Sequence, residues 1–397
     1  MKETWRWYGS LDKIELGEIR QTGASGIVTA LHEIPYGEVW SRDLIRNRLN
    51  QIKAAGMEWS VVESLPISED IKRGTGNLPK LFANYRQSVA NLAAEGIHVI
   101  AYNFMPILDW TRTDLVKPVN TGGTCLRFSA SHMAAFELFI LGRSEAEADY
   151  TPEVIEHAAD WYEKSDEAAR TTLRNSIMSG MPGAFDRYNI AELKQVLKTY
   201  DGLSEENIRA NFKRFLDEVI PTAEELGVRM CVHPDDPPRD ILGLPRIVSD
   251  ASDIDWIMSA HDSPANGLTL CTGSLGANPD NDPAQIARAH ADRIHFAHLR
   301  NVSKEADGSF EEAAHLDGDT NLVEVIEVLL EEEAERYRTS RMDHSIPFRP
   351  DHGHEILSDA ERGTFPGYPL IGRLRGLAEL RGVVKALSDS SSRISHG

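Results

Sequence analysis

The amino-acid sequence predicts an α/β protein, a (β/α)8 barrel of the TIM type, as a single domain over residues 1–397. Eight short runs rich in β-forming residues recur along the chain, and segments with helical patterns separate them. Most of these runs are almost continuously apolar, as in strands that helices cover on both faces. No shift in composition divides the chain, so eight βα units in succession favour one closed barrel.

The predicted strands run into polar loops that proline or glycine marks. They cover residues 4–8, 26–31, 58–64, 97–104, 228–233, 268–271, 293–299 and 346–351. In a closed parallel barrel the carboxyl ends of all strands meet at one mouth, and active sites are built there. We therefore expect functional side chains just after these strands.

Helix signals occupy the segments between the strands. Ser41 is a possible N-cap of the segment RDLIRNRLNQIKAAG, which ends at Gly56. The segment NYRQSVANLAAEG ends in the same way at Gly96. These signals place helices between consecutive barrel strands.

One connection, residues 115–221 between the fourth and fifth strands, is far longer than the usual βα loop of about 2–6 residues. Thr151 followed by Pro152 indicates a helix N-cap, and a second helix opens at Ser204. Apolar side chains then fall on one face of that second helix, namely Ile208, Phe212, Phe215, Leu216 and Val219. We expect a helical insertion at the barrel mouth that acts as a lid or a subunit contact, the latter in a homo-oligomer such as a dimer.

Composition and charge narrow the classes of partner. Of the 397 residues 41% are hydrophobic and 26% charged, as in an ordinary globular protein. The formal net charge of −20 argues against nucleic acid and against acidic membrane surfaces. An acidic protein that handles an anionic substrate needs a local positive site, built from a metal ion or from buried arginines.

The cysteine count and the N-terminal residues indicate the compartment. Three cysteines, Cys125, Cys231 and Cys271, do not make a disulfide framework, so a reducing compartment is expected. The opening residues MKETWRWYGS lack the apolar stretch of a signal peptide. No apolar run approaches the roughly 18 residues of a membrane span. We therefore expect a cytoplasmic protein.

Four residues of metal-binding type stand near the ends of four predicted strands. They are His233 in CVHPDDPP, Cys271 in LTLCTGS, His298 in HFAHLRN and Asp351 in RPDHG. Two imidazoles, a thiolate and a carboxylate suit a divalent transition metal, whereas calcium and magnesium prefer oxygen ligands. The pattern therefore predicts a transition-metal site at the mouth.

Each of these residues also has a structural interpretation. Cys271 could be a buried small hydrophobe, and Asp351 could pair with Arg349 or cap a helix. Cys231 lies on the same strand face as His233, so it could supply the thiolate, but free cysteine more often fills a core layer. His295 is three residues before His298 and faces the other side of its strand, which leaves His298 as the ligand.

Further polar residues suggest the chemistry beside the metal. His352 could orient the metal-bound carboxylate or act as an acid or base, since histidine titrates near neutrality. Tyr368 lies on a bent loop that could reach the mouth, although a loop tyrosine is more often packing. Asn103, Trp110 and Arg112 follow the fourth strand and suit a polyhydroxylated anion; without this fold they would be core and a solvated loop.

A series of short motifs makes the interpretation specific. In chain order they are RWYG, GIVTALHEIPYGEVW, VVESLPI, YNFMPILDWTRT, HPDDPP, CTGS, HLRN, RPDHG and PGY. The sequence from Arg6 to beyond Arg373 closely resembles the mannonate dehydratases of bacterial hexuronate breakdown. Departures such as His354 after DHG and PLIG after the tyrosine put substrate fine-tuning in doubt more than the chemistry.

The resemblance implies a metal-dependent barrel that converts D-mannonate to 2-keto-3-deoxy-D-gluconate, with manganese or ferrous iron as the metal. It implies the ligands His233, Cys271, His298 and Asp351 and an acid/base pair of His352 and Tyr368. As a hypothesis, Arg300 and Arg349 offset negative charge on the substrate. A sugar isomerase or epimerase on the same barrel, or a non-catalytic sugar-acid binding protein, are the alternatives.

Overall fold

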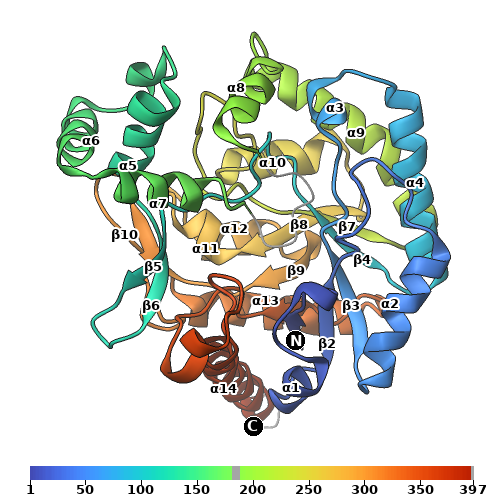
Figure 1. Ribbon diagram of the computed structural model, residues 1–397. Coiled ribbons are helices and arrows are strands. Elements are labelled where there is room, and N and C mark those ends of the chain that lie inside the picture. The colour runs from blue at the N-terminus through green and yellow to red at the C-terminus, as the bar shows by residue number, and fades with distance from the viewer. Residues whose placement is uncertain (181–187, 395–397) are drawn as a thin grey trace.

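The computed structural model describes residues 1–180 and 188–394, and it confirms the predicted barrel. Eight parallel strands close into one barrel, in the order β1-β12-β9-β8-β7-β4-β3-β2. Helices surround these strands, as Figure 1 shows in a view that looks into the barrel. Each predicted run coincides with or overlaps one barrel strand, and the first and the sixth strands each begin two residues earlier than predicted.

The barrel strands are short and lie at the predicted places. They are β1 (Lys2–Arg6), β2 (Gly26–Thr29), β3 (Glu58–Glu63), β4 (Val99–Tyr102), β7 (Arg229–Val232), β8 (Asn266–Cys271), β9 (Ile294–His298) and β12 (Pro347–Arg349).

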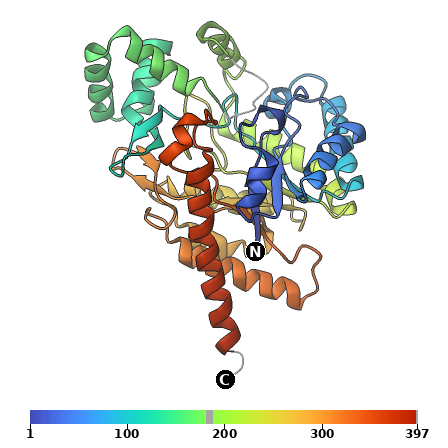
Figure 2. The ribbon, with the colours of Figure 1, turned by 60° about the horizontal axis from the view of Figure 1, so that its bottom comes forward.

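The helices outside the barrel include those whose ends the sequence signals at Ser41, Gly56, Gly96 and Ser204. They are α1 (Leu16–Gln21), α2 (Arg42–Ala54), α3 (Glu69–Arg73), α4 (Leu78–Ala94), α9 (Glu205–Glu225), α10 (Ala251–Ala260), α11 (Thr272–Gly276), α12 (Pro283–Ala289), α13 (Leu322–Arg338) and α14 (Leu370–Ile394). The Ser41 hydroxyl accepts a hydrogen bond from the Leu44 amide at 3.4 Å, which confirms the predicted cap of α2. In Figure 2 the helix α14 projects from the body of the molecule.

Side chains of the barrel strands alternate between the interior and the helix layer, because successive residues of a strand point to opposite faces. One layer inside the barrel is a separate apolar cluster of Val28, Val61, Ala101, Cys231 and Phe296. Their chain neighbours belong instead to the large core shared with the helices. Cys231 thus fills a core layer below the mouth, one of the two alternatives for this residue.

The stretch from residue 115 to 221 contains more than helices. Its helices are α5 (Ala130–Ala135), α6 (Pro152–Lys164), α7 (Glu167–Ile177), α8 (Ile190–Lys198) and most of α9, and residues 181–187 lie outside the described part of the chain. Two strands that the sequence analysis did not anticipate, β5 (Asp114–Pro118) and β6 (Thr124–Phe128), pair with β10 (Val302–Lys304) and β11 (Phe310–Glu312) in an antiparallel sheet. Figure 2 places α5–α8 on the side opposite the N-terminus.

Helix α9 belongs to the barrel wall rather than to a separate lid. It begins at the predicted N-cap Ser204 and packs against α4 and β7. Its five predicted apolar side chains are fully buried, and the rings of Phe212 and Phe104 stack with centroids 4.5 Å apart. Among the described residues, no helix is long and apolar enough to cross a membrane.

Candidate active site

The mouth of the barrel is formed by side chains two positions beyond the interior apolar layer. The alternation of the strands brings one such residue from seven of the eight strands to the same level: Arg6, Glu63, Asn103, His233, Cys271, His298 and Arg349. Four of them are predicted as ligands or substrate-binding residues, and Arg349 is a hypothesis for offsetting negative charge on the substrate. Arg6 and Glu63 were not predicted, although the same counting from the strands would have found them.

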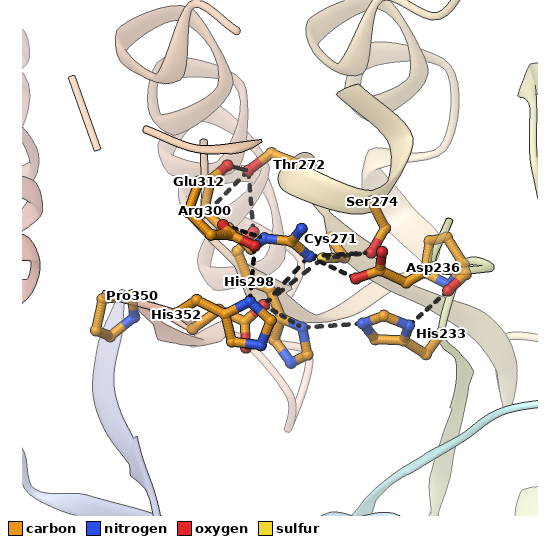
Figure 3. Close-up of polar contacts among 12 residues, drawn as sticks. His233, Asp236, Cys271, Thr272, Ser274, His298, Arg300, Glu312, Pro350 and His352 are labelled. Atoms are coloured by element: carbon orange, nitrogen blue, oxygen red, sulfur yellow. Dashed lines mark hydrogen bonds and ion pairs between the residues drawn. The ribbon is translucent and has the colours of Figure 1, made fainter. Parts of the chain in front are cut away.

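Three of the four predicted ligands converge in this ring. The ligand atoms of His233, Cys271 and His298 all lie within 4.8 Å of one another, and no other group of this kind occurs within residues 1–180 and 188–394. His233 Nε2 lies 3.1 Å from His298 Nδ1, as the close-up in Figure 3 shows. The Pro234 carbonyl, 2.6 Å from His233 Nδ1, fixes the orientation of that ring.

Asp351 stands beside this group rather than within it. Its Oδ2 lies 3.9 Å from His298 Nδ1 and 4.0 Å from Cys271 Sγ. Its Oδ1 accepts a hydrogen bond of 2.5 Å from Arg349 Nη1. The salt bridge to Arg349, the structural interpretation of Asp351, is therefore present. It uses Oδ1 and leaves Oδ2 of Asp351 facing the histidine–cysteine cluster.

The protonation chemistry of the three clustered residues suits a divalent metal. Burial would raise the pKa of the Cys271 thiol, but His233 and His298 hold that pKa well below its usual range. Burial would lower the pKa of His233, yet Cys271, Glu63 and Asp351 raise it to about 9. A thiolate and two facing imidazoles, with Cys271 and His298 buried and His233 half-buried, form the mixed sulfur and nitrogen donor set typical of transition-metal sites. The donor set therefore fits the predicted metal.

The predicted substrate-binding arginines are held by carboxylates. Arg112 donates to Asp236 at 2.7 and 2.9 Å and to Glu312 at 3.2 Å. Arg300 lies between the same two acids, 2.8 Å from Asp236 and 2.7 Å from Glu312, as Figure 3 shows. Only Nη2 of Arg300 and Nε of Arg112 lack a hydrogen-bond partner in the described structure. Most of the donor capacity of both arginines thus serves the protein itself.

Arg349 is engaged in the same way. It donates to Glu63 at 2.8 and 3.2 Å and to Asp351 at 2.5 Å, so each of its three nitrogens has a carboxylate partner. The Glu63 Oε1 atom also lies 3.4 Å from His298 Nε2. Arg349 therefore connects Asp351, beside the histidine–cysteine cluster, to Glu63, beside His298. These hydrogen bonds fix the positions of both carboxylates.

The predicted acid/base residues meet at the edge of the ring. His352 Nε2 lies 3.3 Å from the Tyr368 hydroxyl, and His352 Nδ1 lies 3.0 Å from Glu312 Oε1. Trp110 packs edge-on against the His352 ring with centroids 6.0 Å apart. Burial raises the pKa of Tyr368 well above its ordinary value. Tyr368 thus reaches the mouth, where Glu312, His352 and Tyr368 form a row with His352 in the middle.

The remaining candidates take different positions. Asn103 lines a cleft with Lys72 and Glu69 next to the mouth. Asp235 accepts hydrogen bonds from Val248 and Ser249, and His315 Nε2 lies 2.7 Å from the Pro350 carbonyl. His295 faces the Pro264 carbonyl on the outer side of its strand, as the strand alternation predicted.

Two acids at the centre of the arginine network were missed as site residues. Asp236 lies in the HPDDPP motif, and Glu312 lies in none of the motifs. Both come from loops or from the small sheet. Asp236 is 124 and 64 positions from its two arginine partners, and Glu312 is 200 and 12 positions from the same two. Arg112 and Arg300 lower the pKa of Asp236 against the opposing effect of its burial. Tertiary contacts, rather than any local motif, identify them.

Comparison with known proteins assigns the family. The model of the D-mannonate dehydratase (UxuA) family matches residues 1–394. The chain belongs to this family. It is 52% identical to the mannonate dehydratase of Chromohalobacter salexigens over 388 residues, covering 98% of this chain and 99% of that protein. It is 48% identical to the mannonate dehydratase of Rhizobium meliloti over 398 residues, covering 100% and 99%.

Solved structures agree with this assignment. The crystal structure of mannonate dehydratase from Streptococcus suis serotype 2 superimposes with a TM-score of 0.77 and 34% sequence identity, covering 99% of this chain and 95% of that one. A D-tagatose 3-epimerase-like protein gives a TM-score of 0.50 at 12% identity, covering 98% and 100%. The second likeness reflects the shared barrel alone.

We predict that the ionised Glu312 carboxylate stabilises the folded protein through its arginine partners, and that this stabilisation is lost at acid pH. Burial would raise its pKa, but Arg300, His352 and Arg112 lower it from 4.5 to about 2. A lowered pKa stabilises the fold fully above about pH 4.5, and this stabilisation is lost as the pH falls toward 2. Glu312→Gln should therefore cost about 3 kcal/mol at pH 7 and progressively less below pH 4.5.

The measurement is the free energy of unfolding in urea at a series of pH values. Glu311→Gln is the matched control, because the Glu311 side chain faces Arg127 and Lys117 on the small sheet instead. A Glu312→Gln protein whose stability follows the wild type at every pH would contradict the assigned role of Glu312.

Proposed function

We propose that this chain dehydrates D-mannonate to 2-keto-3-deoxy-D-gluconate and water in a metal-dependent reaction of hexuronate catabolism. Membership of the family over residues 1–394 supports the reaction. The observation that carries the proposal is the cluster of His233, Cys271 and His298 at the mouth, with a histidine–tyrosine pair beside it. A sugar-acid binding protein that had lost catalysis would have no need of this complete set.

The three clustered residues and Asp351 would hold the metal, with Mn²⁺ or Fe²⁺ as the proposed ion. A bound divalent ion would polarise the substrate carboxylate and fix its orientation, which eases loss of the weakly acidic neighbouring proton. Arg349 would keep the Asp351 carboxylate turned toward the cluster through its 2.5 Å hydrogen bond. Glu63 would in turn hold Arg349 in place.

The reaction is a β-elimination. The C2–H bond and the C3–O bond break, a C2–C3 double bond forms, and the resulting enol becomes the 2-keto acid. One group must accept the C2 proton and another must protonate the departing hydroxide, so that water leaves. His352 and Tyr368 are the groups that we assign to these steps.

The row Glu312–His352–Tyr368 supports a division of roles. Glu312 is ionised because its arginine partners lower its pKa to about 2, so His352 Nδ1 donates its hydrogen to Glu312. With a hydrogen on Nδ1, this ring can accept a proton only at Nε2, which faces the Tyr368 hydroxyl. We therefore assign proton acceptance to His352 and proton donation to Tyr368.

The assay that tests the proposal uses D-mannonate with the metal-free protein and with added manganese, iron, cobalt or zinc. We expect a keto-deoxy acid 18 mass units lighter than the substrate, formed only with metal. A product of unchanged mass would instead indicate an isomerase or epimerase. Binding without any product would indicate a binding protein.

The ligand set makes a separate prediction. Cys271→Ala removes the thiolate, so bound metal and activity should both drop sharply. Cys231→Ala is the matched control, because Cys231 lies in the apolar layer below the mouth. The Cys231→Ala protein should therefore bind as much metal as the wild type. Metal analysis of the two purified variants decides the question, and a Cys271→Ala protein with stoichiometric metal at full activity would exclude this site.

The proton-transfer residues should affect turnover without affecting metal content. His352→Asn and Tyr368→Phe should each lower turnover by about two to four powers of ten, the usual effect of a positioned acid or base. Tyr85→Phe and His295→Asn are controls, since these residues contact backbone carbonyls outside the mouth.

Hydrogen exchange at C2 separates the two roles. In deuterated solvent Tyr368→Phe should still exchange the C2 hydrogen of D-mannonate, whereas His352→Asn should not. The opposite pattern would reverse the assignment, and wild-type turnover in both variants would remove both residues from the reaction.

The stretch 115–221 is proposed to cover the mouth or to form a dimer contact. Helix α9 is part of the barrel wall, so an informative deletion removes only residues 130–200 and joins the ends by a short linker. We expect a folded barrel with lost activity or a changed mass in solution. Unchanged kinetics and unchanged mass would show that the stretch has neither role. A cytoplasmic location is part of the same proposal.

A further inference from the structure

Arg6 differs from the three other arginines discussed at the barrel mouth in its contacts with carboxylates. Arg112, Arg300 and Arg349 each contact carboxylates, and together they engage Asp236, Glu312, Glu63 and Asp351. Arg6 is only 1% exposed, yet it forms no ion pair with a carboxylate among the described residues. It is a buried cation at the end of β1 that acts on the more distant carboxylates Glu63 and Asp12 without contacting either one.

The contacts of the Arg6 guanidinium leave donors unused. Nη2 lies 3.4 Å from His32 Nε2, which is a long contact to an imidazole rather than to a carboxylate. Nη1 is buried and has no hydrogen-bond partner in the part of the chain that the structure describes. The guanidinium carbon lies 4.6 Å from the centre of the Tyr8 ring, a cation–π contact that holds the group in place.

A second arginine of the same region shows that burial without a carboxylate can be satisfied. Arg373 is also 1% exposed, but it donates to the carbonyls of Pro369, Arg6 and Tyr368. Within the described part of the chain, no such set of carbonyls surrounds Arg6. A buried donor that has no partner is costly, so the unpaired Nη1 of a buried cation points to a ligand of opposite charge.

The position of Arg6 places it next to the reacting groups. It belongs to the ring that also contains Glu63, His233, Cys271 and His298, one residue from each strand. Its neighbour Tyr8 packs edge-on against Tyr368, with ring centroids 5.1 Å apart. The unpaired donors therefore lie on the tyrosine side of the mouth.

We propose that Arg6 binds the carboxylate of the sugar acid and makes the site specific for acids over neutral polyols. The proposal rests on the proposed function for the identity of the substrate, whose single charged group at neutral pH is that carboxylate. A carboxylate has two oxygens that each accept hydrogen bonds, and a guanidinium can donate two in parallel. Arg6 thereby offsets the negative charge of the substrate, the role that the sequence analysis gives to Arg300 and Arg349.

The experiment compares D-mannonate with D-mannitol, which has the same carbon chain and a hydroxymethyl group in place of the carboxylate. Calorimetry on metal-loaded protein in a His352→Asn background, where turnover is blocked, gives the Kd of each compound. Arg6→Gln should weaken D-mannonate binding about 10- to 100-fold, the usual effect of losing a charged hydrogen-bonded partner, and leave D-mannitol binding unchanged. Arg338→Gln is the control, because that side chain is 72% exposed on α13.

In active protein the same change should raise KM for D-mannonate more than it lowers kcat. If Arg6→Gln does not fold, Arg6→Lys tests the same point, since a lysine keeps the charge but lacks the paired donors, and it should weaken D-mannonate binding at least about threefold. Equal loss of D-mannonate and D-mannitol binding would mean a structural role. An unchanged Kd for D-mannonate would also overturn the proposal.

The outcome for Arg6 is separable from that of the proposed reaction. A wild-type protein that binds D-mannonate but yields no keto-deoxy acid would refute the dehydratase activity, while the Kd comparison would still decide the role of Arg6. A wild-type protein that binds no D-mannonate would overturn both.

Discussion

A buried network of arginine–carboxylate pairs fixes the geometry of the barrel mouth. Asp236 and Glu312 lie between Arg112 and Arg300, while Arg349 joins two further acids. Removing ions from water costs several kcal/mol each, so such pairs add little net stability compared with apolar packing. Their effect is positional, because breaking one pair leaves an unpaired buried charge at a cost of about 3–5 kcal/mol. The network therefore holds the cluster and the acid/base row in one arrangement.

The same network reconciles an acidic protein with an anionic substrate. The net charge of −20 is carried mostly by the surface, whereas the mouth combines buried arginines with nearly matching carboxylates. A divalent ion beside the Cys271 thiolate would leave a small positive excess there. In this environment of low polarity, that excess attracts one carboxylate more strongly than it would in water. Local charge, and not the net charge of the chain, decides what the site accepts.

Strand alternation accounts for the part of the site that the sequence could predict. His233, Cys271 and His298 each stand at the end of a recognisable strand, so their convergence follows from a barrel of parallel strands. Arg6 and Glu63 obey the same rule and were overlooked because arginine and glutamate at a strand end resemble ordinary solvated residues. The loop position of Tyr368 is weak evidence for a catalytic role, and the family resemblance strengthens it. In the structure the Tyr368 hydroxyl lies beside His352.

The sequence by itself determined the eight-stranded barrel, the helix caps and the metal-type residues, because these depend on local periodicity and on short-range hydrogen bonds. Only the tertiary structure decided which charges pair. Arg112 and Glu312 are 200 positions apart, and the small sheet joins β5 and β6 to β10 and β11 from a distant part of the chain. Pairing of this kind depends on which side chains the fold brings within hydrogen-bonding distance. No local pattern in the chain encodes that distance.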